Sequence, residues 1–166
     1  MSESASNRLS PGDNAPLFCL PNHSGQLVCL EQFRGSGVVV YFYPKDMTPG
    51  CSVEASDFNQ LRGEFLAAGL RIVGISPDSP ASHQRFISAL DLGFELLSDP
   101  GHEVMAAWGA YGTKLNYGRE VVGTIRSTFV VDGELKIVAA LYGVKAKGHA
   151  RRLLELVGSE SGTAEG

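Results

Sequence analysis

Residues 38–51 read VVVYFYPKDMTPGC and predict a buried strand followed by the start of a helix. The first part, 38–44, is β-branched or aromatic up to its closing proline, which is typical of a central strand covered on both faces. In the second part, Thr48 is a favoured N-cap residue, and Pro49 suits the first helical position because its missing N–H would have no partner there. The stretch therefore places Cys51 as the third residue of a helix that follows a buried strand.

The segments after Cys51 predict alternating helices and strands. Phe58, Leu61 and Phe65 recur at helical spacing and Gly69 can end a helix, so we expect one helix over 49–68. Asp132-Gly133 predicts a two-residue hairpin turn between strands. The other expected elements are strands at 70–75, 94–97, 124–131 and 135–141 and helices at 81–90, 104–108 and 147–157.

The order of these elements predicts an α/β fold with a mixed central sheet, because the Asp-Gly hairpin adds an antiparallel pair to otherwise parallel strands. A thioredoxin-like fold fits this order. Before the central strand, 17–20 and 27–30 flank a turn at His23-Ser24-Gly25 and predict an N-terminal hairpin. A chain of 166 residues suits one domain, expected at 13–158. The polar, small-residue ends at 1–12 and 159–166 are expected to be flexible tails.

Composition and charge favour small molecules or proteins as partners. The net charge is -4 with a pI near 5.5, and the basic residues are spread along the chain, so we expect no binding to nucleic acid or to an anionic membrane. No apolar run approaches the roughly 20 residues that cross a bilayer. The N-terminus MSESASNRLSPGD lacks the basic start and apolar stretch of a secretory signal. A cytoplasmic, reducing location is expected.

Cys51 is predicted to be a reactive thiol. An N-cap hydroxyl normally reaches the N–H of the second or third helical residue, which would bring the Thr48 oxygen beside Cys51. Unpaired N–H groups at a helix start and the positive end of its dipole stabilise a thiolate. Gly50 allows close approach to the backbone. The alternative is a buried cysteine that only fills space, and these three features favour reactivity over it.

Arg126 is a permanent cation in the segment TIRSTFVV, whose other members are mostly apolar or small. An unpaired buried charge is costly, so this guanidinium should face a carboxylate, a thiolate or an anionic ligand. Glu54 lies three residues after Cys51, on nearly the same helix face, and could orient Arg126 toward the sulfur. The alternative is an edge residue paired with a surface carboxylate.

Taken together, YFYPKDMTPGC, GTIRSTFVVDG and VKAKGHA resemble the bacterioferritin comigratory protein branch of the peroxiredoxins, also called the Q type. The resemblance extends in the same order over roughly 12–156, and includes LLSDP at 96–100 and Tyr117-Gly118. It implies a thioredoxin-like fold to which the N-terminal hairpin is an addition. It also implies that Cys51 is the peroxidatic cysteine, with Thr48, Pro49 and Arg126 completing the active-site set.

The expected activity is the reduction of hydrogen peroxide and organic hydroperoxides without a metal or organic cofactor. The Cys51 thiolate would attack the terminal peroxide oxygen, release water or an alcohol and become a sulfenic acid. Arg126, the Thr48 hydroxyl and helix-start N–H groups would stabilise the charge that moves onto the leaving oxygen. Pro44 and Pro49 would help to exclude water from the thiolate.

The chain departs from the commonest pattern of this branch in its resolving cysteine. Ser56 stands where many relatives carry it, and the expected helix at 81–90, where others carry it, contains none. We therefore expect a one-cysteine cycle with thioredoxin, glutaredoxin or a low-molecular-weight thiol as reductant. Cys19 and Cys29 flank Ser24 symmetrically and should lie opposite each other across the hairpin. Inert strand packing is the favoured interpretation of this pair, while its pairing or a resolving role stays open.

Other functions are disfavoured by specific residues. The histidines and cysteines lack the paired spacing of a structural zinc site, so no metal is expected. A disulfide oxidoreductase usually needs Cys-x-x-Cys, but Thr48 stands in place of the first cysteine. A redox-sensing or chaperone-like binding protein remains an alternative, and catalytic turnover with a reductant would distinguish it from a peroxidase.

Overall fold

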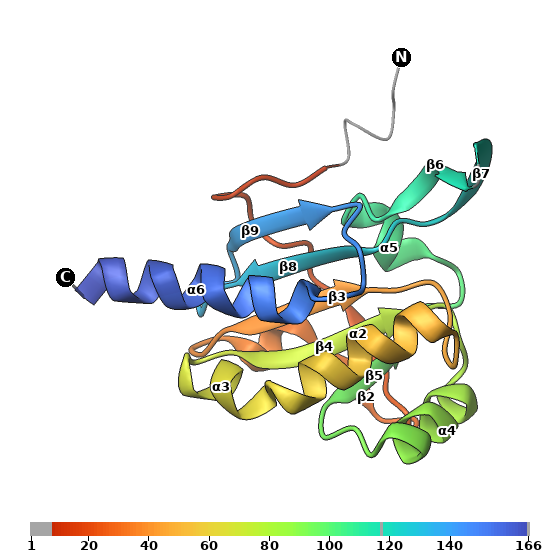
Figure 1. Ribbon diagram of the computed structural model, residues 1–166, viewed down its shortest axis with the longest axis horizontal. Coiled ribbons are helices and arrows are strands. Elements are labelled where there is room, and N and C mark those ends of the chain that lie inside the picture. The colour runs from red at the N-terminus through yellow and green to blue at the C-terminus, as the bar shows by residue number, and fades with distance from the viewer. Residues whose placement is uncertain (1–7, 117, 166) are drawn as a thin grey trace.

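A sheet of five strands forms the centre of the computed structural model, which describes residues 8–116 and 118–165 (Figure 1). The strand order is β5-β4-β3-β8-β9, in which β3, β4 and β5 are parallel, β8 is antiparallel to β3, and β9 is antiparallel to β8. The predicted α/β class with a mixed sheet is confirmed. The strands are Val38–Phe42 (β3), Arg71–Ser76 (β4), Glu95–Ser98 (β5), Ser127–Val131 (β8) and Ile137–Tyr142 (β9).

The central strand β3 is buried on both faces, as its sequence predicts. Tyr41 belongs to the core on one side of the sheet, here called the helix face, and Val40 to the core on the other, here called the hairpin face. Helices α2 (Pro49–Gln60), α4 (Pro80–Leu90) and α6 (His149–Glu165) pack on the helix face. The hairpin face is covered by α5 (Glu103–Ala107) and by the N-terminal hairpin, β1 (Cys19–Pro21) and β2 (Leu27–Cys29), which leads into the 3-10 helix η1 (Leu30–Phe33).

The helix predicted over 49–68 is in fact two helices, α2 and α3 (Arg62–Ala67), so that prediction is wrong in its extent. The interruption falls at Leu61, whose φ and ψ are -95° and 5°. Gly63, with its low helix propensity, lies in the first turn of α3 and weakens a continuous helix there. Gly69 has a φ of +85° and follows the end of α3, as expected for a left-handed helix stop.

The structure describes part of each expected tail, and the flexibility of both stays a prediction. Helix α6 continues to Glu165, well past the predicted end at 157, although Ser, Gly and Thr in this segment are weak helix formers. Residues 1–7 of the expected N-terminal tail lie outside the described residues. Gly12, its last residue, donates its N–H to the carbonyl of Ile137 at 2.8 Å and so joins the edge strand β9.

A second hairpin, β6 (Tyr111–Asn116) and β7 (Arg119–Thr124), was not predicted from the sequence. It projects from the body of the protein in Figure 1. Its glycines and charged residues have low strand propensity, so its pattern resembles a loop. Because Thr124 ends β7 and β8 begins only at Ser127, the strand predicted at 124–131 is wrong in its first part. Tyr117 lies outside the described residues.

The turn between β8 and β9 is longer than the predicted Asp-Gly pair. Asp132 donates its N–H to the carbonyl of Lys136 at 3.0 Å, and Leu135 adopts a left-handed φ of +63°. The Asp132 carboxylate organises this loop by accepting the N–H groups of Glu134 and Lys136. The antiparallel pairing is therefore confirmed and the two-residue turn is wrong.

In the N-terminal hairpin, Cys19 pairs directly with Cys29 and their sulfurs form a disulfide. Leu30 donates its N–H to the Phe18 carbonyl at 3.0 Å, so the neighbouring cysteine pair occupies a non-hydrogen-bonded position, where the two backbones come closest. Their Cα atoms are 4.0 Å apart. The predicted placement across the hairpin is confirmed, and the expectation that the two cysteines only pack, without a covalent bond, is wrong.

Reducing this disulfide is expected to lower the free energy of unfolding by roughly 2–3 kcal/mol, because the bond closes a short loop in the unfolded chain. Urea denaturation of the Cys51→Ser variant with and without a dithiol measures the loss while no other thiol can react. The triple variant that also lacks Cys19 and Cys29 is the control and should show no effect of the dithiol. Equal midpoints for the oxidised and reduced forms would contradict this expectation.

Candidate active site

Helix α2 begins where the sequence predicts. Thr48 is its N-cap in an extended conformation and Pro49 is its first residue. Ser52 donates its N–H to the Thr48 carbonyl at 2.8 Å. The Thr48 side chain makes no capping hydrogen bond, however, and its Oγ1 donates instead to the Lys45 carbonyl at 2.9 Å. The prediction that this hydroxyl caps the helix is wrong, because the loop folds back through the left-handed Met47 and brings Lys45 within its reach.

Cys51 lies in the first turn of α2 with only 1% of its surface exposed. It belongs to the core of the helix face, together with Tyr41, Tyr43 and Phe58. Because Cys19 and Cys29 are bonded to each other, Cys51 is the one free thiol of the chain. Its burial fits both a space-filling cysteine and a protected nucleophile, so its polar neighbours decide between them.

Arg126 supplies the polar contact to the thiol. Its Nη2 donates to Cys51 Sγ at 3.4 Å and its Nη1 donates to Glu54 Oε1. The Arg126 side chain is 18% exposed and that of Glu54 is fully buried. Arg126 lies in the connection between β7 and β8, so its predicted place within a strand is wrong. The alternative of a pairing with a surface carboxylate is also wrong, because the partner is buried.

Gly50 leaves room for the guanidinium. A Cβ at this position would lie 3.4 Å from Arg126 Nη2 and 3.9 Å from the Cβ of Ala146. A side chain longer than Ala would therefore meet Arg126. The close neighbour of this glycine is thus the Arg126 side chain, in addition to the close approach to backbone that was predicted.

Burial and the pairing with Arg126 have opposite effects on the pKa of Glu54. Burial raises the pKa of Glu54 to about 7, and Arg126 counteracts only part of this rise. Burial acts to lower the pKa of Arg126, but the neighbouring Glu54 and Cys51 outweigh it, so the pKa of Arg126 is raised. Among the described residues, Glu54 Oε2 has no hydrogen-bond partner. Glu54 therefore changes its protonation state near neutral pH while it holds the guanidinium.

The raised pKa of Glu54 predicts a pH dependence of stability. The folded state holds this proton up to about pH 7, whereas the unfolded chain releases it near 4.5. The free energy of unfolding should therefore fall as the pH rises between these values, by at most on the order of 3 kcal/mol. Urea denaturation between pH 4.5 and 8 should show this decline in the wild type and not in Glu54→Gln. The same decline in both proteins would contradict the assignment.

The two predicted shielding prolines differ in exposure: Pro44 is half-buried and Pro49 is exposed. Pro44 follows β3 and begins the loop that leads to Cys51, and Pro49 starts α2. Their effect on water near the thiol remains a prediction.

A buried carboxylate and imidazole connect the loop before Cys51 to α4, and neither residue was predicted from the sequence. Asp46 Oδ2 lies 2.7 Å from His83 Nδ1 of α4, and Asp46 Oδ1 accepts the Tyr43 hydroxyl at 2.6 Å. His83 Nε2 lies 3.0 Å from the Leu97 carbonyl. Burial acts to raise the pKa of Asp46, but the hydrogen bonds of His83 and Tyr43 outweigh it and the pKa is lowered. The pair ties the loop to α4.

Lys114 is a further cation near the site. It extends from β6 and its Nζ donates to the Thr124 carbonyl at 2.5 Å. Burial lowers the pKa of Lys114, and the positive charge of Arg126 lowers it further. Lys114 was not predicted as a site residue because strand β6 was not predicted.

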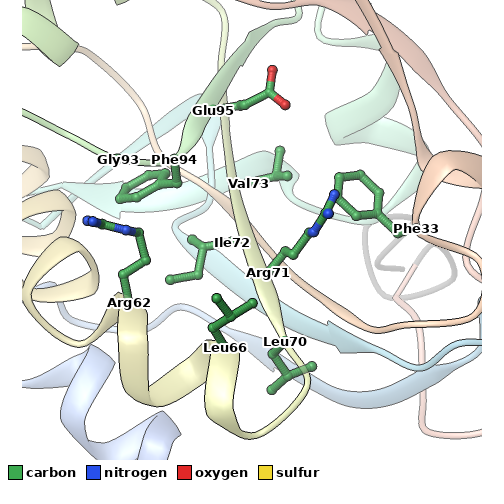
Figure 2. Close-up of a pocket in the computed structure, with 10 residues that line it drawn as sticks. All are labelled: Phe33, Arg62, Leu66, Leu70, Arg71, Ile72, Val73, Gly93, Phe94 and Glu95. Atoms are coloured by element: carbon green, nitrogen blue, oxygen red, sulfur yellow. The ribbon is translucent and has the colours of Figure 1, made fainter.

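A cavity of about 260 Å³ lies away from these residues, along the first half of β4 (Figure 2). Two arginines, Arg62 and Arg71, line this cavity. The Arg71 guanidinium lies 5.9 Å from the centroid of the Phe33 ring, in a cation–π contact. Cys51, Arg126 and Glu54 do not line it. Within 8–116 and 118–165, no three His, Cys, Asp or Glu side chains are grouped so that they could hold a metal, and no helix is long and apolar enough to cross a membrane.

The chain has recognisable relatives across most of its length, and residues 11–140 match the AhpC/TSA family. The chain belongs to the AhpC/TSA family. This AhpC/TSA chain is 56% identical over 146 residues to a protein of Mycobacterium tuberculosis H37Rv that is named a peroxiredoxin, covering 88% of the chain and 93% of that relative. It is 41% identical over 143 residues to peroxiredoxin Bcp of Escherichia coli, covering 86% and 92%.

Among solved structures, the AhpC/TSA chain is similar to the bacterioferritin comigratory protein of Xanthomonas campestris, with a TM-score of 0.80 and 38% identity over 86% of this chain and 91% of the other. The thioredoxin-like fold is thereby confirmed, and so is the resemblance to the bacterioferritin comigratory protein branch. The chain is an enzyme, a thiol-dependent peroxidase.

Proposed function

We propose that the enzyme reduces hydrogen peroxide and organic hydroperoxides at Cys51, with Arg126 and Thr48 as the other catalytic residues. The observation that carries this assignment is the contact of 3.4 Å between Arg126 Nη2 and Cys51 Sγ, in a site where that sulfur is almost fully buried. The related X. campestris protein is described for its alkyl peroxide reduction activity, which supports an organic hydroperoxide as substrate.

In the first half of the cycle, the Cys51 thiolate attacks the terminal oxygen of the hydroperoxide. An S–O bond forms, the O–O bond breaks, and the leaving oxygen takes a proton and departs as water or an alcohol. Negative charge moves from sulfur to the leaving oxygen during this step. Arg126 already contacts the sulfur, and Glu54 holds the other nitrogen of its guanidinium in place. The guanidinium is therefore positioned to stabilise the negative charge that develops on the leaving oxygen.

Thr48 and the start of α2 hold the peroxide in this proposal. The proton of the Thr48 hydroxyl is donated to Lys45, so its oxygen is free to accept a hydrogen bond from the O–H of a hydroperoxide. The N–H groups of Gly50 and Cys51, at the second and third helical positions, have no intrahelical partner and can donate to peroxide oxygens. Pro44 and Pro49 limit the access of water at the two ends of the loop.

In the second half of the cycle, an external thiol reduces the Cys51 sulfenic acid. The thiol sulfur bonds to Cys51 Sγ and water leaves, after which a second thiol releases Cys51 and forms an external disulfide. A one-cysteine cycle is supported by the position of the other two cysteines. Their hairpin packs on the hairpin face, and Cys51 lies on the helix face. The proposed reductant is thioredoxin, glutaredoxin or a small thiol, in the cytoplasm.

The experiment that tests this proposal treats the wild type with one equivalent of hydrogen peroxide or of an alkyl hydroperoxide in the presence of dimedone, which traps sulfenic acids. Peptide mass mapping should place the adduct on Cys51, with peroxide and trapped sulfur in equal amounts. Peroxide consumption without a Cys51 adduct would contradict the site. A disulfide from Cys51 to Cys19 or Cys29 in a sample without dimedone would contradict the one-cysteine cycle.

A further inference from the structure

The N-terminal hairpin carries an exposed disulfide on a surface of its own. Cys19 is exposed and Cys29 is half-buried, although both stand next to well-buried residues such as Phe18 and Val28. The side chains of the hairpin alternate, so that Phe18, Val28 and Leu30 pack into the core of the hairpin face. The disulfide lies on the opposite, outward side of the two strands.

Two leucines share this outward side. Leu17 is 59% exposed and Leu27 is 63% exposed, and each stands two residues from one of the paired cysteines. Alternation along β2 places Leu27 and Cys29 on the same side. Leu17 precedes β1, but exposure alternates there in the same way, because Leu17 and Cys19 are exposed on either side of the buried Phe18. Together, Leu17, Cys19, Leu27 and Cys29 form an apolar surface with a disulfide within it, which is here called the hairpin surface.

The chemistry of the bond limits what this surface can bind productively. A disulfide is cleaved by a thiolate that attacks one sulfur and displaces the other, and exposed disulfides are the ones that react. In a reducing compartment, disulfides are usually transient and serve catalysis or redox sensing. A small, charged thiol gains little binding free energy from two exposed leucines. A protein with an apolar surface around its thiol would bury both leucines and bind more tightly.

We propose that the hairpin surface is a docking site for a dithiol oxidoreductase, and that Cys19–Cys29 is a second redox-active site that works independently of Cys51. The partner thiolate attacks the exposed Cys19 Sγ, the sulfur–sulfur bond breaks, and Cys29 leaves as a thiolate that takes a proton from water. The second thiol of the partner then attacks the mixed disulfide and releases Cys19. The partner is oxidised to a disulfide and the hairpin is reduced to two thiols.

The position of the hairpin separates this exchange from the peroxidatic thiol. Cys51 belongs to the core of the helix face, and the inner residues of the hairpin belong to the core of the hairpin face. The five-stranded sheet therefore lies between the two sulfur sites. A partner that is docked at the hairpin surface cannot reach Cys51 of the same chain at the same time.

The first test uses the Cys51→Ser variant, so that its result does not depend on the peroxidase activity. The oxidised variant is mixed with thioredoxin, used here as the dithiol reductase, in a form that lacks its second cysteine. Mixed disulfides between the two proteins are then mapped by mass spectrometry without reduction. The expected product links the reductase to Cys19. A link to Cys29 would overturn the proposed point of attack, and the absence of any link would overturn the docking site.

The second test separates docking from chemistry. In the Cys51→Ser background, Leu17→Ser with Leu27→Ser should slow reduction by the intact reductase about tenfold, which corresponds to about 1.4 kcal/mol. Reduction by dithiothreitol should stay unchanged, which also shows that the disulfide is intact. The matched control is Leu66→Ser with Leu115→Ser, two exposed leucines elsewhere. Equal rates for the two double variants with the reductase would overturn the proposal.

Discussion

Replacing Cys51 by Ser is expected to lower the rate of peroxide reduction at least about 10³-fold, because a hydroxyl at this position remains protonated and is a far weaker nucleophile than a thiolate. The substitution is close to isosteric in a fully buried site, so the fold should be retained. Stopped-flow measurement of peroxide consumption in a single turnover gives the rate. Thermal unfolding of the same samples checks that they are folded.

The matched control for this loss is the variant with Cys19→Ser and Cys29→Ser, which removes the other two sulfurs and keeps Cys51. Its single-turnover rate should stay within about twofold of the wild type, because the sheet separates the hairpin from the site. If Cys51→Ser retained more than about a tenth of the activity, the nucleophile would have to be sought elsewhere.

Replacing Arg126 by Met is expected to slow the reaction of Cys51 with peroxide by about 10²–10³-fold, since removing one preorganised donor from a transition state has effects of this size. Met retains much of the volume and none of the charge. Glu54 would lose its partner and take up a proton, because burial already raises its pKa to about 7. The variant should therefore stay folded below neutral pH, and the rates are best compared near pH 6.

A second reagent distinguishes the two ways in which Arg126 could act. If the guanidinium only stabilises the thiolate, Arg126→Met should slow alkylation by iodoacetamide as much as it slows the peroxide reaction. If it also stabilises the leaving oxygen, the peroxide reaction should be slowed at least about tenfold more. Lys114→Met is the control for loss of a nearby cation and should change both rates by less than about threefold. Equal slowing of both reactions in Arg126→Met would contradict the second role.

The parts of the fold that follow local rules could be predicted from the sequence. The apolar run of β3 and the Thr-Pro start of α2 fixed the strand, the helix and the place of Cys51, because strand burial and helix capping depend on neighbouring residues. The hairpin β6–β7 could not be predicted in the same way. Its strands are rich in glycine and charge, and they are held by pairing with each other. Such pairing is a tertiary property that composition does not reveal.

The contacts of the site are also of two kinds: some follow from local spacing in the sequence, and others depend on tertiary packing. Glu54 could be associated with Cys51 because helical spacing places them on one face. The side chain of Thr48 could not be placed from the sequence, because its hydroxyl can bond either to a helix N–H or to the Lys45 carbonyl. The path of the loop decides which of the two partners lies within reach. Asp46 and His83 are 37 residues apart, and each looks like an ordinary polar residue in its own segment. Their pairing depends on the packing of α4 against the loop.

The buried pair of Asp46 and His83 bears on how quickly the enzyme would be inactivated by its own substrate. Because Cys51 is only 1% exposed, we expect a protein thiol to reach its sulfur only when the first turn of α2 opens. If the opening extends into the preceding loop, it has to break the buried contact between Asp46 and His83 of α4. In the proposed cycle, this opening would compete after each oxidation with a second peroxide molecule, which would convert the sulfenic acid into a sulfinic acid that thiols do not reduce. The strength of one buried pair would thus set how many cycles an enzyme molecule completes before it is inactivated.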